Sequence, residues 1–304
     1  KIKAENIINS TFIKDDENYK GEFIKSYFKQ QMPMPSYLVV FSCCEVEAYK
    51  LSERSNLYCV SNYIEQVKEH FIKEDIEKVI KEAENMIGMK FQFPEFNILI
   101  LPYYNYFGME NPFLVYISKN SYKSKMLLYH ELIHFWVGNL VTCKNWDCFW
   151  INEGITTYLE TKLNYRLNKD EYDLVEIIES EKERVMYFVA GLNEGNHIKK
   201  LSLVTDFKHL DPGKFWSDLP YLKGCMLMRL IEDLIGEENL FFIIMNLVQD
   251  YKFKNIDSEE LKCFFNSNIK ELLDIKRIKS TKSYEEIIST ISWDDWFHDE
   301  TYYV

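Results

Sequence analysis

The sequence lacks an apolar run long enough to span a membrane, and no signal peptide is visible at Lys1. It also lacks an initiator methionine, so residue 1 need not be the natural start. Basic residues are in deficit, since 36 Lys and Arg stand against 48 Asp and Glu, for a net charge of −12. This charge argues against nucleic acid and against an anionic membrane as partners.

Cysteine pairing motifs are also missing. The seven cysteines are an odd number, and no two of them form a Cys-x-x-Cys pair: Cys43, Cys44, Cys59, Cys143, Cys148, Cys225 and Cys263. We therefore expect reduced thiols in a cytoplasmic protein. With 47% hydrophobic and 16% aromatic residues, the 304-residue chain is globular and can form one large or two ordinary domains.

The most informative stretch runs from Met126 to Glu153. Its first half is apolar nearly all the way round, which predicts a buried helix, yet it carries His130, Glu131 and His134. Buried polar groups are costly unless they are satisfied. At about 100° per residue, the two histidines lie one turn apart on the same face of a helix. This His-Glu-x-x-His spacing predicts two zinc ligands, with Glu131 as general base.

A third ligand is expected from the next helical pattern. Eighteen residues separate His134 from Glu153, which lies near the start of a helix predicted from Asn152 onward. Two histidines and one glutamate leave a fourth metal position open, as catalytic zinc sites do. Glu160 falls on the same face as Glu153; it either orients a ligand histidine or is an ordinary solvated glutamate. Cys143 and Cys148 flank this loop, but we do not expect them to be ligands.

The motifs resemble those of the zinc aminopeptidases of the aminopeptidase N family, a branch of the gluzincins, and especially the leukotriene A-4 hydrolase group. The matching segments are the histidine motif with Gly138 to Thr142, Asn145 to Gly154, and Pro220 to Gly224. The resemblance runs from about Met32 to the C-terminus. It implies one zinc ion per chain and an α+β, thermolysin-like catalytic domain with a mixed-sheet lobe and a helical lobe.

The resemblance also implies a domain organisation. Residues 1–47 would be a remnant of an N-terminal β-saddle domain, and residues 48–300 the catalytic domain. The C-terminal helical domain of relatives would be absent. Exposed apolar surface left by missing domains would make the chain poorly soluble alone.

A second family signature precedes the zinc motif. Gly108, Met109, Glu110 and Asn111 resemble the exopeptidase signature Gly-x-Met-Glu-Asn, whose strand pairs with the substrate and whose Glu binds the free α-amine. A carboxylate that binds the α-amine at a fixed distance from the metal would place the first peptide bond at the metal. The enzyme would then remove one residue at a time from the N-terminus. The first Gly of the signature is Phe107 here, and its bulky ring puts the shape of the first subsites in doubt.

A tyrosine completes the expected site. Tyr221 follows Pro220 at the mouth of an apolar helix, where packing is the ordinary role. In the resembling family the tyrosine of this Pro-Tyr-x-Lys-Gly context donates its hydroxyl to the tetrahedral intermediate. Gly213 stands where the epoxide-opening relative has an acidic residue, which weakens an epoxide-hydrolase interpretation.

Periodicity predicts the remaining elements. Strands are expected at residues 37–42, 57–60, 97–101 and 113–117, and helices at 63–89, 221–234, 237–251 and 257–268. Gly88 and Gly236 are expected helix stops, and Asp257 with Glu260 a capping box.

Three hypotheses remain open on the sequence alone. The first is a zinc aminopeptidase that acts on peptides with a free N-terminus. The second is a hydrolase for a lipid epoxide. The third is a truncated or inactive homologue that binds zinc or a partner without turnover.

Overall fold

The computed structural model describes residues 5–8, 11–15, 26–169, 183, 202–207 and 217–298. The chain divides into two compact units. The first combines Lys1–Lys81 with Phe91–Phe135, and the second combines Glu82–Lys90 with Trp136–Val304. The domain boundary expected at residue 47 stays a prediction.

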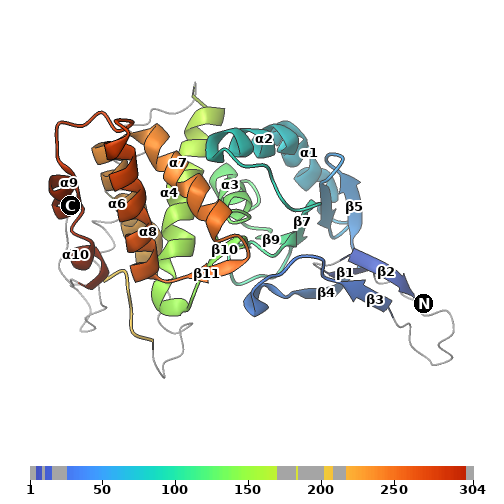
Figure 1. The fold of residues 1–304 in the computed structure, drawn as a ribbon. Coiled ribbons are helices and arrows are strands. Elements are labelled where there is room, and N and C mark those ends of the chain that lie inside the picture. Colours follow the sequence, from blue (N-terminus) through green and yellow to red (C-terminus); the bar gives the residue numbers. More distant parts are fainter. Residues whose placement is uncertain are drawn as a thin grey trace. The chain divides into compact units, whose positions relative to one another are not determined.

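A five-stranded mixed sheet forms the centre of the first unit (Figure 1). In spatial order its strands are β5 (Glu47–Lys50), β6 (Asn56–Cys59), β7 (Phe96–Leu101), β9 (Phe113–Ser118) and β8 (Gly108–Met109). The three central strands are parallel, and the two edge strands run antiparallel to their neighbours. β7 and β9 are buried almost throughout, as their runs of apolar residues predicted.

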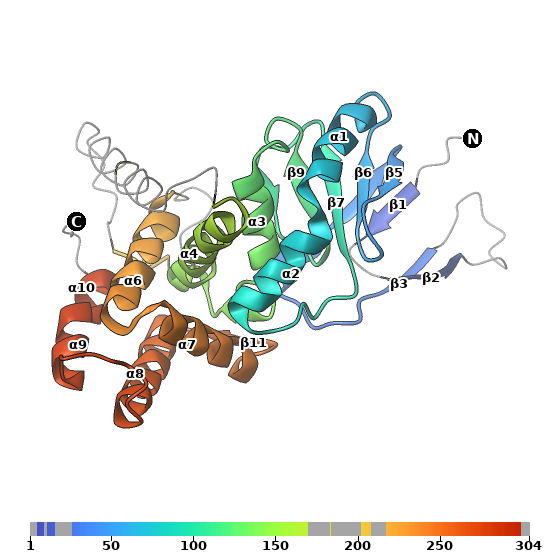
Figure 2. The same cartoon turned by 90° about the horizontal axis from the view of Figure 1, so that it is seen from above.

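Two helices lie across one face of this sheet, α1 (Ile64–Glu74) and α2 (Ile76–Ile87) (Figure 2). The sequence predicted one helical segment here, and the structure interrupts it at Asp75, which adopts the left-handed conformation with φ 43°. The predicted stop is confirmed, because Gly88 follows α2 with φ 76°, a conformation that glycine adopts without strain.

The N-terminal region forms two small antiparallel pairs: β1 (Glu5–Ile8) with β4 (Phe41–Cys44), and β2 (Thr11–Asp15) with β3 (Ser26–Lys29). The strand expected over residues 37–42 was wrong in its first half. A 3₁₀ turn, η1 (Ser36–Leu38), occupies that position, with Leu38 N–H donating to the Pro35 carbonyl at 3.1 Å. Pro35 fixes its own φ at the turn entrance, and the side chain of Leu38 is fully buried there.

The second unit is mainly helical. Two short strands, β10 (Val141–Cys143) and β11 (Lys254–Ile256), pair in parallel, and η2 (Trp146–Cys148) is a 3₁₀ turn. The described residues of this unit form α4 (Trp150–Leu167), α6 (Leu219–Ile235), α7 (Glu237–Asp250), α8 (Ser258–Asp274), α9 (Tyr284–Ile291) and α10 (Trp293–His298). The predicted helices at 221–234, 237–251 and 257–268 are thereby confirmed, as are the stop at Gly236 and the Asp257–Glu260 capping box.

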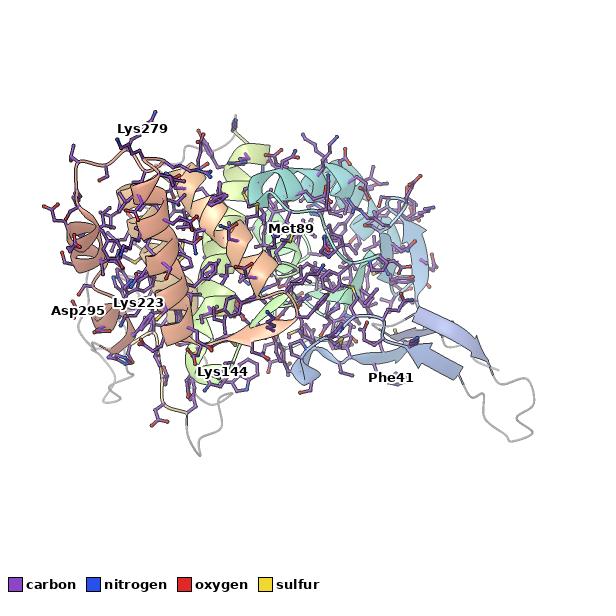
Figure 3. All side chains as sticks on the ribbon, viewed as in Figure 1. Phe41, Met89, Lys144, Lys223, Lys279 and Asp295 are labelled. Carbon is purple, nitrogen blue, oxygen red and sulfur yellow. The ribbon has the colours of Figure 1, made fainter. Side chains whose placement is uncertain are left out.

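Side chains fill the interior of the second unit (Figure 3). Trp150 is completely buried and donates its indole N–H to the Ser258 hydroxyl at 2.9 Å, which ties α4 to α8. Lys223, labelled in the figure, is also buried, with its ammonium 5.8 Å from the centre of the Trp296 ring. Apolar packing with satisfied polar groups therefore fixes the helices that carry the candidate site.

No helix in the described ranges combines the length and the apolar character needed to cross a membrane.

Candidate active site

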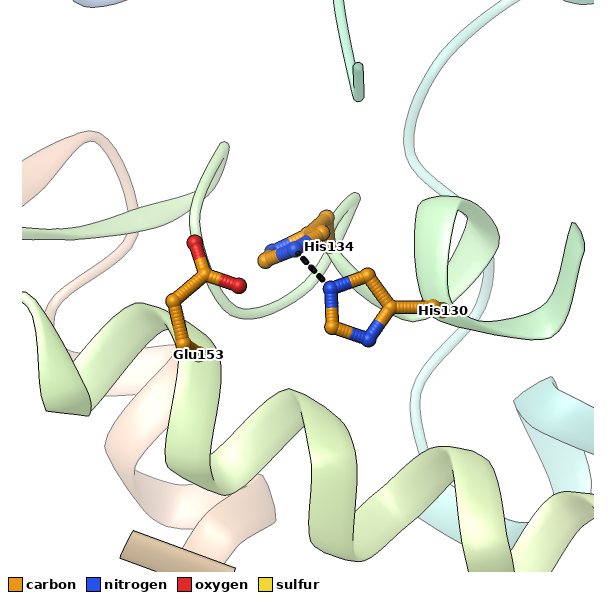
Figure 4. A group of neighbouring side chains, drawn as sticks. All are labelled: His130, His134 and Glu153. Carbon is orange, nitrogen blue, oxygen red and sulfur yellow. Dashed lines mark hydrogen bonds between the residues drawn. The ribbon is translucent and has the colours of Figure 1, made fainter. Parts of the chain in front are cut away.

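The three predicted metal ligands lie together. One donor atom from each of His130, His134 and Glu153 falls within 4.8 Å of the other two. Figure 4 shows both imidazole rings and the Glu153 carboxylate converging, with Nε2 of His134 2.9 Å from Nε2 of His130. Among the described residues, this group is the one that brings three such side chains together.

Local structure explains why these side chains converge. Ser124 caps α3 (Lys125–Ile133) by accepting the Leu127 N–H at 3.1 Å, and His134 is the C-cap. The His134 N–H still donates to the His130 carbonyl at 3.1 Å, so the predicted one-turn spacing is preserved. Glu153 lies in the first turn of α4, as expected.

The start of α4 is held by buried hydrogen bonds. The fully buried Asn152 accepts the Cys143 N–H on Oδ1 at 2.8 Å, and the Thr156 hydroxyl donates to the Val137 carbonyl at 3.2 Å. These two bonds join the first two turns of the helix to the loop and strand that follow α3. Glu153 is therefore carried on a fixed backbone, as a metal ligand must be.

The donor set fits zinc. Two imidazole nitrogens and one carboxylate oxygen are the ligand types of catalytic zinc sites. His134 and Glu153 are 2% and 4% exposed, so a carboxylate and an imidazole are buried side by side, which favours a shared cation. Cys143 and Cys148 are buried, form no disulfide and lie outside the ligand group.

Glu131 lies beside the predicted peptide-binding strand. Its side chain is 4% exposed, and a Cβ added to Gly108 would overlap its Oε1. A larger residue at position 108 would therefore require the Glu131 carboxylate to move. The same Glu131 carboxylate also acts on the hydroxyl of Tyr104. Burial raises the pKa of Tyr104, and the carboxylates of Glu131 and Glu110 raise it further.

The predicted exopeptidase segment ends in two buried polar residues and is followed by a strained one. Glu110 is 6% exposed, and the fully buried Asn111 amide has no hydrogen-bond partner in the described part of the chain. Phe113 follows with φ 66°, a conformation that costs energy for a bulky residue. An unpaired buried amide two residues before a strained residue is more typical of a binding site than of a structural turn.

Tyr221 lies in the first turn of α6, where its ring packs edge-on against Phe149 at 6.0 Å between centroids. Glu160 is half-buried on α4, two turns beyond Glu153. The roles of Tyr221 and Glu160 stay predictions. Gly213 lies outside the described residues.

Tyr104 was not singled out from the sequence, although its place in the aromatic run from Tyr103 to Phe107 was a usable signal.

Comparison with known families decides the classification. The model of the peptidase family M1 domain matches residues 71–284. The chain belongs to this family. The resemblance inferred from the motifs is thus confirmed, and family membership with the ligand group identifies the cofactor as zinc.

About three residues in ten are identical between this chain and each of two curated relatives. Leukotriene A-4 hydrolase of Xenopus laevis is 30% identical over 277 residues, and leucine aminopeptidase 2 of Emericella nidulans is 31% identical over 277 residues. Each alignment covers 89% of this chain and 42% of the relative. The chain therefore spans less than half the length of these relatives.

Solved structures confirm the α+β fold. The structure of yeast LTA4 hydrolase in complex with bestatin superposes with a TM-score of 0.82 at 24% identity, covering 97% of this chain and 45% of that one. An M1 zinc metallopeptidase from Deinococcus radiodurans superposes with a TM-score of 0.71 at 14% identity, covering the whole of this chain and 63% of that one.

Proposed function

We propose that this chain is a zinc-dependent aminopeptidase that removes N-terminal residues from peptides. The observation that carries the proposal is the convergence of His130, His134 and Glu153 on α3 and α4. Zinc held by these residues would act as a Lewis acid and lower the pKa of water. Membership of peptidase family M1 supports peptides as the substrate class.

The chain's own residues supply the remaining chemistry. Glu131 takes the proton from the attacking water and later delivers it to the leaving amine. The Tyr221 hydroxyl donates a hydrogen bond to the oxyanion that forms on the attacked carbonyl. Both groups lie on ordered helices or at their first turns, which supports a preorganised site.

The exopeptidase segment binds the substrate. Glu110 accepts hydrogen bonds from the α-ammonium, and a charge-assisted bond of this kind discriminates against blocked N-termini. Gly108 allows close approach of the peptide backbone, since it lacks a Cβ. Met109 and Asn111 complete the substrate-binding segment. Met109 packs against the buried cluster of Leu99, Leu114 and Tyr116.

The charge and the cysteines support a cytoplasmic protein that acts on peptides rather than on nucleic acid or membrane. The net charge is −12, and the described cysteines form no disulfide with one another: Cys44, Cys59, Cys143, Cys148, Cys225 and Cys263.

Hydrolysis of a panel of aminoacyl-anilides by the zinc-loaded chain tests the proposal. We expect turnover that is lost with chelator, restored by zinc, and reduced about 10²- to 10⁴-fold by Glu131→Gln. The N-acetylated form of the best substrate is the matched control and is expected to be inert. Absence of turnover with one zinc bound per chain would instead support a binding protein without activity.

Epoxide opening is a second candidate, favoured by the 30% identity to a leukotriene A-4 hydrolase. Gly213 argues against it, because it replaces the acidic residue of the epoxide-opening relative. Turnover of a lipid epoxide by the zinc-loaded chain, monitored beside the anilide assay, separates the two candidates.

A further inference from the structure

Phe107 is a large aromatic side chain in an unusual place. Its side chain is 70% exposed, although it directly precedes the edge strand β8. Its carbonyl accepts the Ser118 N–H at 2.8 Å, so its backbone belongs to the ladder between β8 and β9. An exposed ring on a fixed backbone has no role in the core of this unit and is free to contact a ligand.

The pairing pattern shows which backbone groups face the open edge. Gly108 lies opposite Ile117, and Met109 lies opposite Tyr116. In an antiparallel ladder, residues that bond to the partner strand alternate with residues whose N–H and C=O point away. Because Phe107 bonds to β9 through Ser118, the N–H and C=O of Gly108 point toward the outer edge. That edge has no further strand in the described part of the sheet, so a peptide in extended conformation can pair there.

The order of groups along this segment orients such a peptide. Glu110, the proposed amine anchor, lies at one end. Gly108, in the middle, contacts the carboxylate of Glu131, the proposed general base. The bond to be cut therefore lies beside Gly108, with the free N-terminus toward Glu110. The part of the peptide that leaves after cleavage then lies toward Phe107.

We propose that Phe107 selects the residue that follows the cut, favouring apolar and aromatic side chains over glycine. This inference rests on the proposed aminopeptidase function and names the substrate class of that same site. A side chain directly across an antiparallel pair lies about 5 Å away, within reach of an aromatic ring. Aromatic contacts of this kind correspond to about three- to tenfold in affinity.

Two other aromatic residues of the preceding loop are also exposed. Tyr103 and Tyr106 are 96% and 65% exposed, and the rings of Tyr106 and Tyr104 lie edge-on at 5.6 Å. Tyr103 is nearly free of protein contacts and lies farther from β8 in the chain. It therefore offers a matched control, an exposed aromatic of the same loop that the proposal does not use.

The test measures binding rather than turnover. In the zinc-loaded Glu131→Gln background, calorimetry compares the dipeptides Leu-Phe and Leu-Gly. We expect Leu-Phe to bind about three- to tenfold more tightly. Phe107→Ala should reduce that ratio to near one without weakening Leu-Gly, Phe107→Leu should restore part of it, and Tyr103→Ala should leave it unchanged.

The outcomes separate this inference from the function on which it rests. If both dipeptides bind and Phe107→Ala leaves their ratio as it was, the role of Phe107 is overturned and the aminopeptidase proposal stands. If neither dipeptide binds while one zinc is present per chain, both proposals fail. Zinc content and a thermal melt of each variant exclude misfolding, and Phe107→Leu gives a second reading at the same position.

Discussion

Gly154 and Gly224 are in direct backbone contact where α4 and α6 pack together. A Cβ at Gly154 would lie 2.5 Å from the Gly224 Cα, and a Cβ at Gly224 would lie 2.7 Å from the Gly154 Cα. Gly154 directly follows the proposed ligand Glu153, and Gly224 lies three residues after Tyr221. The absence of two side chains thus sets the spacing of the helices that carry a proposed metal ligand and the proposed oxyanion donor.

The substitution Gly154→Ala tests this contact, because the contact decides whether the free energy of unfolding rises or falls. In an open helix, replacing glycine with alanine stabilises by up to about 1 kcal/mol. Here the added methyl meets backbone atoms, and we expect a loss of about 1–3 kcal/mol in the free energy of unfolding, as overpacking produces. Denaturant melts measure it. A stabilised variant would show that the helices are free to separate.

Tyr221→Phe should lower kcat about 10²- to 10³-fold and leave KM nearly unchanged, because the hydroxyl acts on charge that develops only in the transition state. The ring contact with Phe149 is kept, so the fold should not suffer. Tyr251→Phe is the control, since Tyr251 caps the far end of α7. An equal rise in KM with an unchanged kcat would assign Tyr221 to substrate binding instead.

Much of the site followed from local sequence signals. The one-turn spacing of His130 and His134 and the start of a helix at Glu153 depend on helix geometry, which short-range patterns encode. The same holds for the stops at Gly88 and Gly236.

Long-range contacts escaped prediction for a physical reason. Nothing near Gly154 in the sequence indicates that Gly224 will meet it, because the contact depends on how two helices pack. The first half of the strand expected at Tyr37 to Ser42 was wrong because Pro35 and the burial of Leu38 together favour a 3₁₀ turn over an extended strand. The break at Asp75 likewise interrupts a pattern whose apolar spacing continues across it.

Glu110→Gln should raise KM for substrates with a free amine about 10- to 100-fold, because a hydrogen bond between two charged groups becomes a weaker one. The chain length of the substrate should matter less in the variant, since the fixed anchor is weakened. Glu69→Gln, on the exposed side of α1, is the matched control. If wild type and Glu110→Gln have the same steady-state kinetics, Glu110 does not bind the substrate amine.

A partly buried ion network in the second unit predicts how stability depends on pH. Lys162 on α4 is 3% exposed, and its Nζ lies 2.5 Å from Glu232 and 2.9 Å from Glu237; Arg166 also contacts Glu237 at 3.0 Å. Burial of the Glu237 carboxyl opposes its ionisation, yet the hydrogen bonds and charges of Lys162 and Arg166 hold its pKa below the ordinary value of 4.5.

A carboxyl whose pKa is lower in the folded state binds fewer protons than it does in the unfolded chain. Its contribution to stability is therefore complete above pH 4.5 and is lost as pH falls through the lower, folded pKa. Thermal melts from pH 6 downward should show this loss in the wild type, and Glu237→Gln should show a smaller fall over the same range. Glu238→Gln, the adjacent residue in the first turn of α7, controls for general acid sensitivity. Identical slopes in wild type and Glu237→Gln would mean that Lys162 and Arg166 do not favour the ionised form of Glu237.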